Sequence, residues 1–317
     1  MTNPLTTPLL RIGTRGSPLA LWQANTVRAL LAAAHPELAP PGAVAIIPIR
    51  TTGDTVRDRT LAAIGGKGLF TKEIEEALTA GTVDLAVHSM KDVPTVLPDG
   101  LAIGCVLERE DPRDAFFSAK GSGIAALPAG AVVGTASLRR QAQVLRARPD
   151  LTVVPLRGNV DTRLRKLEEG AIDATLLALA GLKRLGLAAR ATSVVETAEM
   201  LPAVAQGAIG IETRIGDTRV ALYLEALHHA PTARRIEAER ALLAALDGSC
   251  RTPIAALAEI GAEGRLSLRA QIIRPDGSEM HETTRTGSPE DGEAMGRDAG
   301  AELRSRAGPG FFDESGA

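Results

Sequence analysis

The sequence predicts an α/β protein of two similar lobes, followed by a small α+β domain at the C-terminal end. Three observations support this prediction. Apolar strands alternate with amphipathic helices between residues 9 and 178, short sequence echoes recur in the same order in two halves of that stretch, and the pattern changes near Pro231. Alternating strands and helices form parallel sheets with right-handed crossovers.

The composition is that of a soluble globular protein with room for two or three domains. The chain has 317 residues, of which 44% are hydrophobic and 23% are charged. Its net charge of −2 argues against a general nucleic-acid binder. No apolar run approaches the roughly 20 residues of a membrane helix, the first ten residues carry no secretory pattern, and two cysteines form no disulfide framework. We therefore expect a cytoplasmic protein without nucleic-acid or membrane partners.

The first half reads as strand, helix, strand, helix, strand. Ser17 is a good N-cap and Pro18 a good first residue for the first helix, because a serine hydroxyl accepts an unpaired N–H and proline lacks one. Thr71 is expected to cap the second helix and Gly81 to end it. The expected strands are 9–14, 44–50 and 83–90, and the expected helices are 19–34 and 72–80.

The second half repeats this order. Residues 12–14 echo 133–135, and residues 81–84 echo 170–173, whereas the stretch 52–68 has no counterpart. Two such units predict two related lobes. The expected strands here are 131–135, 151–157 and 172–178, and the expected helices open at Ser137 and span 161–169.

The C-terminal part has a different pattern. A helix is expected at 234–246, then a loop that contains Cys250, and then alternating segments with a Pro-Asp-Gly turn at 275–277 that predict a small antiparallel sheet. The expected strands are 255–260, 266–273 and 279–286, the closing helix is 290–306, and residues 308–317 are expected to be disordered.

Polar and basic side chains follow the expected strand ends, where open α/β sheets bind their ligands. A helix start with Ser and Arg suits an anion, because its N–H groups and dipole favour negative charge. Capping alone would also explain Ser17 or Ser137, but two copies at matching places favour a polyanion. The side chains concerned are Arg15, Ser17, Lys91, Asp92, Ser137, Arg139, Arg140 and Arg157.

Asp92 and Cys250 are the candidates for chemistry. Asp92 is either a turn residue or a carboxylate for a substrate that also carries a donor or a developing positive charge. Cys250 is either a buried inert thiol or, beside Arg251 in a loop, an activated nucleophile or covalent anchor. Cys105 lies in the apolar segment 101–107 and is expected to be structural. The five histidines show no metal-ligand spacing, so no metal is expected.

Seven ordered runs carry a family resemblance: TRGSPLALWQ at 14–23, GGKGLF at 65–70, VHSMKDVP at 87–94, EREDPRDA at 108–115, SLRRQ at 137–141, LRGNV at 156–160 and AGLKRLG at 180–186. With them the chain resembles the porphobilinogen deaminase family over about residues 9–308. The resemblance implies two periplasmic-binding-protein-like lobes with mixed, mostly parallel sheets, plus a small α+β domain. The implied domains are 1–108 with 206–228, 109–205, and 229–317, with a lid at about 52–68.

The resemblance also implies an activity. Members of this family condense four porphobilinogen molecules head to tail with loss of ammonia, and then release hydroxymethylbilane for haem, chlorophyll and cobalamin synthesis. One dipyrromethane cofactor per chain would be joined by a thioether to Cys250. The catalytic aspartate falls on Asp92, whose carboxylate would stabilise positive charge as ammonia leaves. The family match implies a transferase, and we expect a monomer.

Matching the family motifs residue by residue assigns the remaining roles. Ala136 and Ala63 stand where Ser and Lys are common in the family, so this chain would lack one hydroxyl contact and one lid contact of its relatives. The cofactor would be held by Ser89, Lys91, Thr135, Ser137, Arg139, Arg140, Arg157 and Gly158. Porphobilinogen and the growing oligopyrrole would be held by Arg15, Ser17, Lys67, Arg163 and Arg184.

Two alternatives belong to other classes. A non-catalytic two-lobed anion-binding or sensor protein would have no use for Cys250 and would tolerate Asp92→Asn. A carboxylate-processing enzyme with a cysteine nucleophile would need a histidine base. His228 and His229 are its only nearby candidates in the sequence, and nothing pairs them with Cys250.

Overall fold

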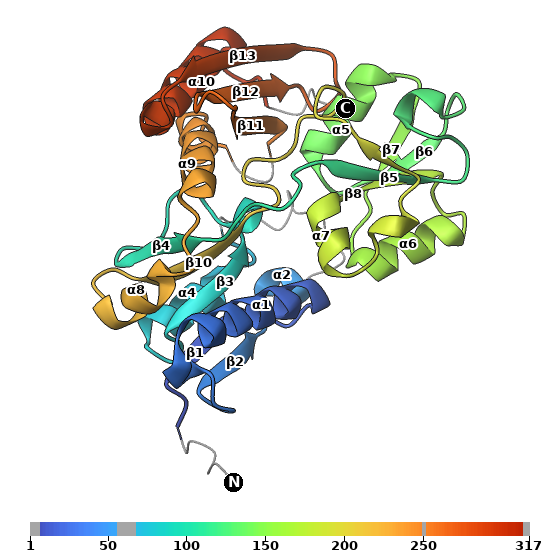
Figure 1. Ribbon diagram of the computed structural model, residues 1–317. Helices are drawn as coiled ribbons and strands as arrows, with labels where there is room; N and C mark the ends of the chain where they lie inside the picture. The colour runs from blue at the N-terminus through green and yellow to red at the C-terminus, as the bar shows by residue number, and fades with distance from the viewer. Residues whose placement is uncertain (1–6, 56–67, 249–251, 313–317) are drawn as a thin grey trace. The chain divides into compact units, whose positions relative to one another are not determined.

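The computed structural model describes residues 7–55, 68–248 and 252–312, and these separate into two compact units (Figure 1). One unit comprises the described residues of 1–56, 66–109 and 208–233 and forms lobe 1. The other comprises those of 110–207 and 234–317 and contains lobe 2 and the C-terminal domain. Among the described helices, none is long and apolar enough to cross a membrane.

Lobe 1 is a five-stranded sheet in the order β2-β1-β3-β10-β4. Strand β1 is parallel to β2 and β3, whereas β10 is antiparallel to β3 and β4, so four of the five strands share one direction. The sheet consists of β1 (Leu10–Arg15), β2 (Val44–Ile49), β3 (Leu85–Ser89), β4 (Leu101–Val106) and β10 (Ile209–Arg214).

Helices cover both faces of this sheet. The face with Leu85 and Val87 packs against α1 and α8, while Ala86, between them in β3, packs on α4 on the other face. This follows from the alternation of side chains along a strand. Ser17 caps the first helix as predicted, but the Thr71 hydroxyl makes no capping bond within the described residues. The helices are α1 (Pro18–Ala34), α2 (Thr52–Thr55), α4 (Lys72–Thr79) and α8 (Thr218–Glu225).

Lobe 2 repeats this architecture. Its sheet order β7-β6-β8-β5-β9 matches that of lobe 1 strand for strand, with β5 in the antiparallel place of β10. Helix α5 covers one face, and α6 and α7 cover the other. The elements are β5 (Asp114–Ser118), β6 (Val132–Gly134), α5 (Leu138–Ala147), β7 (Thr152–Val154), α6 (Val160–Glu168), β8 (Ala174–Ala178), α7 (Leu179–Arg184) and β9 (Ser193–Val195).

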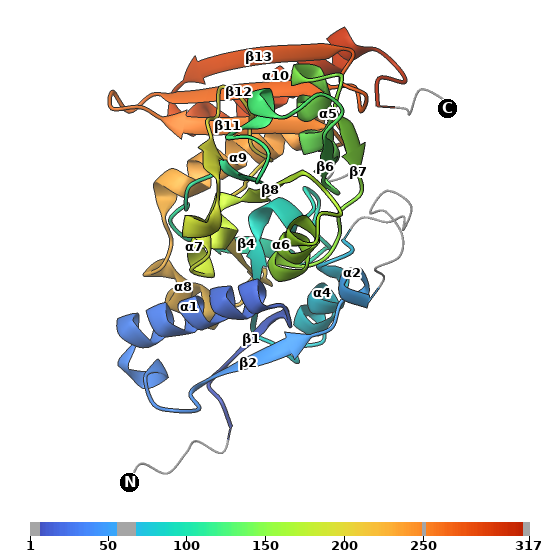
Figure 2. The same cartoon turned by 90° about the vertical axis from the view of Figure 1, so that its right-hand side faces the viewer.

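The C-terminal domain is an antiparallel sheet β11-β12-β13 with α10 packed on it (Figure 2). Gly296 lies directly against α9, since a Cβ there would be 2.2 Å from the Ala238 carbonyl oxygen. Leu201 from lobe 2 packs on β11. The elements are α9 (Ala230–Ala245), β11 (Ile254–Ile260), β12 (Leu266–Ile273), β13 (Met280–Gly287) and α10 (Gly292–Ala307).

The predicted fold class is confirmed, with differences in detail. The strand expected at 151–157 is only Thr152–Val154, and the helix expected at 234–246 begins at Ala230. The expected disorder of 308–317 is wrong for the described residues 308–312, because Phe311 is 2% exposed and packs beside His281 and Arg274. A few apolar side chains among polar residues are too weak a pattern to predict an ordered segment from the sequence.

Candidate functional site

The carboxyl end of β1 leads directly into the first turn of α1. The Ser17 hydroxyl accepts a hydrogen bond of 3.3 Å from the Ala20 N–H, so it is occupied in capping the helix. Arg15 points to the α4 side of the sheet, where its guanidinium lies 4.2 Å from the centre of the Phe70 ring. A stacked arginine loses little freedom on binding a carboxylate, since its planar group is already held.

Asp92 and Lys91 lie in a tight turn at the carboxyl end of β3. The turn is a single 3₁₀ segment (Met90–Asp92), closed by a bond of 3.2 Å from the Val93 N–H to the Met90 carbonyl. Met90 is 1% exposed and packs on Gly210 of the neighbouring strand, which leaves no room for a Cβ there. This buried anchor fixes the turn and leaves Lys91 and Asp92 half-buried at the sheet edge.

Ser89 precedes this turn and faces α1. Its hydroxyl accepts a hydrogen bond of 2.8 Å from Gln23 Nε2, and Gln23 is itself buried. The sheet edge of lobe 1 therefore brings together the ends of β1 and β3, the first turns of α1 and the segment 89–92. The strand-end pattern predicts Arg15, Ser17, Lys91 and Asp92 at these places, and Ser89, whose role the family resemblance implies, lies beside them.

The corresponding edge of lobe 2 is the turn from β6 into α5. The buried Thr135 hydroxyl accepts a bond of 3.1 Å from the Ser137 N–H. The Ser137 hydroxyl accepts one of 3.4 Å from the Arg140 N–H, which caps the helix as the sequence predicted. Capping and anion binding are compatible at a helix start, because one hydroxyl satisfies only some of its unpaired N–H groups.

Arg139 and Arg140 are buried, which the sequence did not indicate. Each is 5% exposed, and both guanidinium groups bind Asp114, whose residue is 1% exposed. Arg139 Nη2 donates to Asp114 Oδ2 at 2.7 Å, and Arg140 donates through Nε at 3.1 Å and through Nη2 at 2.8 Å. Burial alone would raise the pKa of Asp114, but the two positive charges and their hydrogen bonds outweigh it and hold that pKa well below its usual range.

Four further predicted residues of lobe 2 follow this cluster in the sequence. Gly158 has φ 116°, a conformation that suits glycine, and its carbonyl accepts a bond of 2.9 Å from Arg163 Nε. Arg157 precedes it and is half-buried. Arg184 donates to the Gly207 carbonyl at 2.6 Å, and burial lowers its pKa while the charge of Glu110 acts the other way.

Two functional candidates were missed from the sequence. Asp114 lies in the EREDPRDA run that carries the family resemblance, but no local pattern marks it as a site residue, nor does one mark Gln206, which donates to Asp114 at 2.8 Å. A buried acidic residue at the start of an antiparallel strand has no local signal. Its importance appears only when the arginines of α5 fold onto it.

Lys67 and Cys250 lie outside the described residues, as does most of the predicted lid at 52–68. Their proposed roles therefore depend on the sequence. The other cysteine is described: Cys105 is fully buried in β4, and burial raises the pKa of its thiol to about 12. Such a thiol is unreactive at neutral pH.

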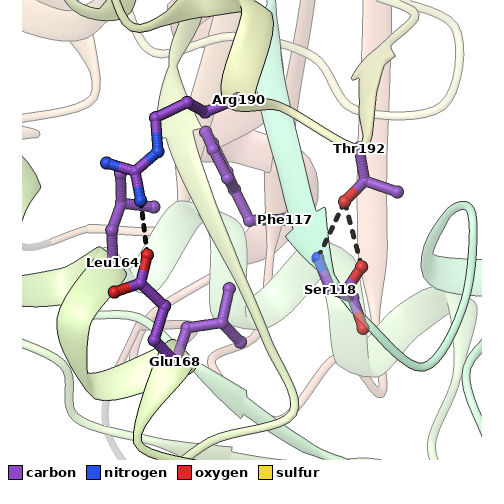
Figure 3. Close-up of a pocket in the computed structure, with 7 residues that line it drawn as sticks. Phe117, Ser118, Leu164, Glu168, Arg190 and Thr192 are labelled. Carbon is purple, nitrogen blue, oxygen red and sulfur yellow. Dashed lines mark hydrogen bonds and ion pairs between the residues drawn. The ribbon is translucent and has the colours of Figure 1, made fainter.

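A small pocket of about 170 Å³ lies at the opposite edge of lobe 2 (Figure 3). Ser118, one of its lining residues, pairs with Ala174 at the beginning of β8, whereas Asp114 pairs with Ala178 at its end. Arg190 is bound to Glu168 at 2.5 Å, and the Thr192 hydroxyl binds the Ser118 backbone. Since these polar groups satisfy one another, the pocket is not the candidate anion site.

Comparison with known proteins places the chain among similar sequences of one family. The family described as "Porphobilinogen deaminase, dipyromethane cofactor binding domain" matches residues 10–222, and "Porphobilinogen deaminase, C-terminal domain" matches residues 233–305. The chloroplastic porphobilinogen deaminase of Oryza sativa is 59% identical over 96% of this chain and 86% of the relative. That of Nitrobacter hamburgensis is 58% identical over 96% of this chain and 95% of the relative.

Solved structures with similar folds are more distant. A putative methionine-binding lipoprotein of Bacillus subtilis has a TM-score of 0.42 at 15% identity, covering 69% of this chain and 90% of that one. The periplasmic aliphatic sulphonate binding protein of Escherichia coli has a TM-score of 0.41 at 14% identity, covering 75% and 70%.

Proposed function

The chain belongs to the porphobilinogen deaminase family, and we propose that it condenses four porphobilinogen molecules into hydroxymethylbilane, with Asp92 and Cys250 in the key roles. The reaction is a stepwise head-to-tail condensation with loss of ammonia on a covalent dipyrromethane, followed by hydrolytic release. The structural observation that best supports the proposed site is the cluster of Arg139, Arg140 and Asp114 at the carboxyl end of the parallel strands of lobe 2. Among the described residues, two permanent positive charges there meet one negative charge.

The described residues fit a cofactor that carries carboxylates. Arg139 Nε is buried and has no acceptor among the described residues, and a buried donor without a partner is costly. An acetate or propionate group would supply that acceptor and balance the excess charge. When bound, dipyrromethane would supply the primer to which new pyrrole units are added. The residues that would hold it are Ser89, Lys91, Thr135, Ser137, Arg139, Arg140, Arg157 and Gly158, with Cys250 as the point of attachment.

Asp92 would act on the incoming substrate. Its carboxylate lies at the end of β3 in a turn that Met90 anchors, so it can be held in place without reorganising during the reaction. It would accept hydrogen bonds from pyrrole N–H groups and stabilise the positive charge that develops as ammonia leaves. Arg15, Ser17, Lys67, Arg163 and Arg184 would bind the carboxylates of porphobilinogen and of the growing chain.

A cytoplasmic location and a monomeric state remain part of the proposal. The plant relatives are chloroplastic by name.

The intact mass of the purified, denatured protein tests the proposed function, with Cys250→Ser as the matched control. We expect an excess mass of two linked pyrroles in the wild type and none in the control. The wild type should also release ammonia and hydroxymethylbilane from porphobilinogen. An unmodified wild type that neither takes up porphobilinogen nor turns it over would instead support the two-lobed binding protein.

A further inference from the structure

The carboxylate of Asp114 is the centre of a buried network. Besides the two arginines, Gln206 Nε2 donates to its Oδ1 at 2.8 Å, so this carboxylate accepts four N–H groups within 3.1 Å. Gln206 is 1% exposed and also donates to the Pro112 carbonyl at 2.7 Å. Charge-assisted hydrogen bonds of this length are about twice as strong as neutral ones.

The topology of lobe 2 explains why Asp114 is there. As the first residue of the antiparallel strand β5, it pairs with Ala178, the last residue of β8. It therefore lies at the carboxyl end of the parallel strands, where open α/β sheets bind their ligands. It shares a face of the sheet with Phe116, which belongs to the core beneath α5. The first turn of α5 carries Arg139 and Arg140 to this position. In lobe 1 the equivalent position, opposite Ser89, is the apolar Ile209.

Without Asp114 the two arginines could not keep this arrangement. Two buried guanidinium groups of like charge repel one another, and each would lose its charged acceptor. Arg139 keeps a second hydrogen bond of 2.8 Å from Nη1 to the Leu201 carbonyl, whereas the Arg140 side chain makes no hydrogen bond to another described residue besides Asp114. The position of Arg140 in particular depends on this carboxylate.

We propose that Asp114 is a positioning residue for the anion site of lobe 2: it holds Arg139 and Arg140 side by side, so that the pair presents one excess positive charge and a free donor to a carboxylate of the dipyrromethane. This inference rests on the proposed function. Asp114 does not contact the reacting atoms. Its loss should therefore affect cofactor loading and substrate affinity more than the rate of the chemical step.

The test compares three variants of the full-length protein. Asp114→Asn keeps the shape but removes the charge, and Asp114→Glu keeps the charge. Asp84→Asn is the matched control, because Asp84 is also a buried carboxylate held by arginines, 5% exposed and bound to Arg11 at 3.0 Å, but it precedes β3 at the opposite end from Asp92. The measurements are the loaded fraction by intact mass, KM and kcat for porphobilinogen, and the melting temperature.

We expect Asp114→Asn to raise the KM for porphobilinogen about tenfold, so that kcat/KM falls by the same factor. The fraction of enzyme loaded with cofactor should also fall, while kcat per loaded enzyme stays near that of the wild type. Asp114→Glu should recover part of the loading. Asp84→Asn should lose thermal stability but load normally with an unchanged KM. If Asp114 had a purely structural role, the Asp114→Asn and Asp84→Asn variants would not differ in cofactor loading and KM in this way.

Three results would overturn the inference. Asp114→Asn could load and bind porphobilinogen like the wild type, or Asp84→Asn could lose loading in proportion to its lower melting temperature, as Asp114→Asn does. Alternatively, Asp114→Asn could lower kcat per loaded enzyme with KM unchanged, which would assign Asp114 to the chemistry itself. A wild type without covalent cofactor and without turnover would overturn the proposed function as well, and this outcome is visible before any variant is measured.

Discussion

The carboxylates of Asp84 and Asp173 occupy equivalent positions in the two lobes. Asp84 accepts a hydrogen bond of 2.8 Å from the Arg11 N–H in β1, and Asp173 accepts one of 2.8 Å from the Val132 N–H in β6. Each aspartate directly precedes the third strand of its sheet and follows a glycine with positive φ, 68° at Gly81 and 74° at Gly170. The sequence echo of 81–84 with 170–173 is therefore a repeated turn that ties the helix end to the opening strand.

Asp84→Asn should destabilise lobe 1 in a pH-dependent way. Burial alone would raise the pKa of Asp84, but the hydrogen bonds and charge of Arg11, with help from Arg219, hold it below its usual value. The ionised carboxylate therefore stabilises the fold above the unfolded pKa of about 4, and this contribution is lost as the pH falls through the folded pKa. We expect a loss of about 2 kcal/mol at pH 7.

Urea titrations of wild type and Asp84→Asn at neutral pH and at about pH 3 measure this difference in unfolding free energy. The gap between the two proteins should narrow at the lower pH. A gap that is the same at both pH values would contradict the assignment of the lowered pKa.

Gly296→Ala should destabilise the C-terminal domain. Alanine favours helix by about 1 kcal/mol over glycine, but its Cβ would be 2.2 Å from the Ala238 carbonyl oxygen and 2.9 Å from the Ala241 Cβ. Because the nearest atom is backbone, α9 and α10 must move apart, so we expect a net loss of about 1–2 kcal/mol. Gly123→Ala is the control, since nothing lies within 4 Å of that position. Equal melting temperatures for both variants would show that the helices are not in close contact.

Asp92→Asn should keep the fold and lose nearly all turnover. The side chain is half-buried in a turn whose anchor is Met90, so its replacement removes little packing. Loss of a preorganised charge that stabilises the transition state should reduce kcat by at least about 100-fold. Steady-state product formation and the melting temperature should be measured together. Near-normal turnover by this variant would exclude Asp92 as the catalytic carboxylate.

The number of titratable thiols should distinguish the two cysteines. Cys105 is fully buried with a pKa of about 12, so a thiol reagent at about pH 8 should not react with it in the native protein. After denaturation, the cofactor-loaded wild type should show only one thiol, because Cys250 would be held as a thioether. Two thiols in the denatured, loaded protein would show that the cofactor is attached elsewhere. Rapid labelling of native Cys250→Ser would show that Cys105 is accessible.

The local signals in the sequence predicted much of the fold correctly. Ser17 and Ser137 cap their helices, because capping depends on a hydroxyl and the N–H groups within three residues of it. The strands that were missed, β5, β9 and β10, are completed by partners distant in the chain. Whether such a short segment forms a strand depends on the neighbouring strands with which it pairs, and the segment's own sequence does not indicate them.

The sequence by itself determined the family, the two-lobed α/β class and the identity of the candidate residues. Family motifs, strand–helix alternation and helix caps each depend on residues that are close together in the chain. Only the tertiary structure decided that Arg139 and Arg140 are buried on Asp114. That contact joins residues 25 and 26 positions apart through an antiparallel strand and a helix on the same face of the sheet. The stability of a buried charge network depends on which charged groups are removed from water and paired with one another. This pairing is defined only by the folded chain.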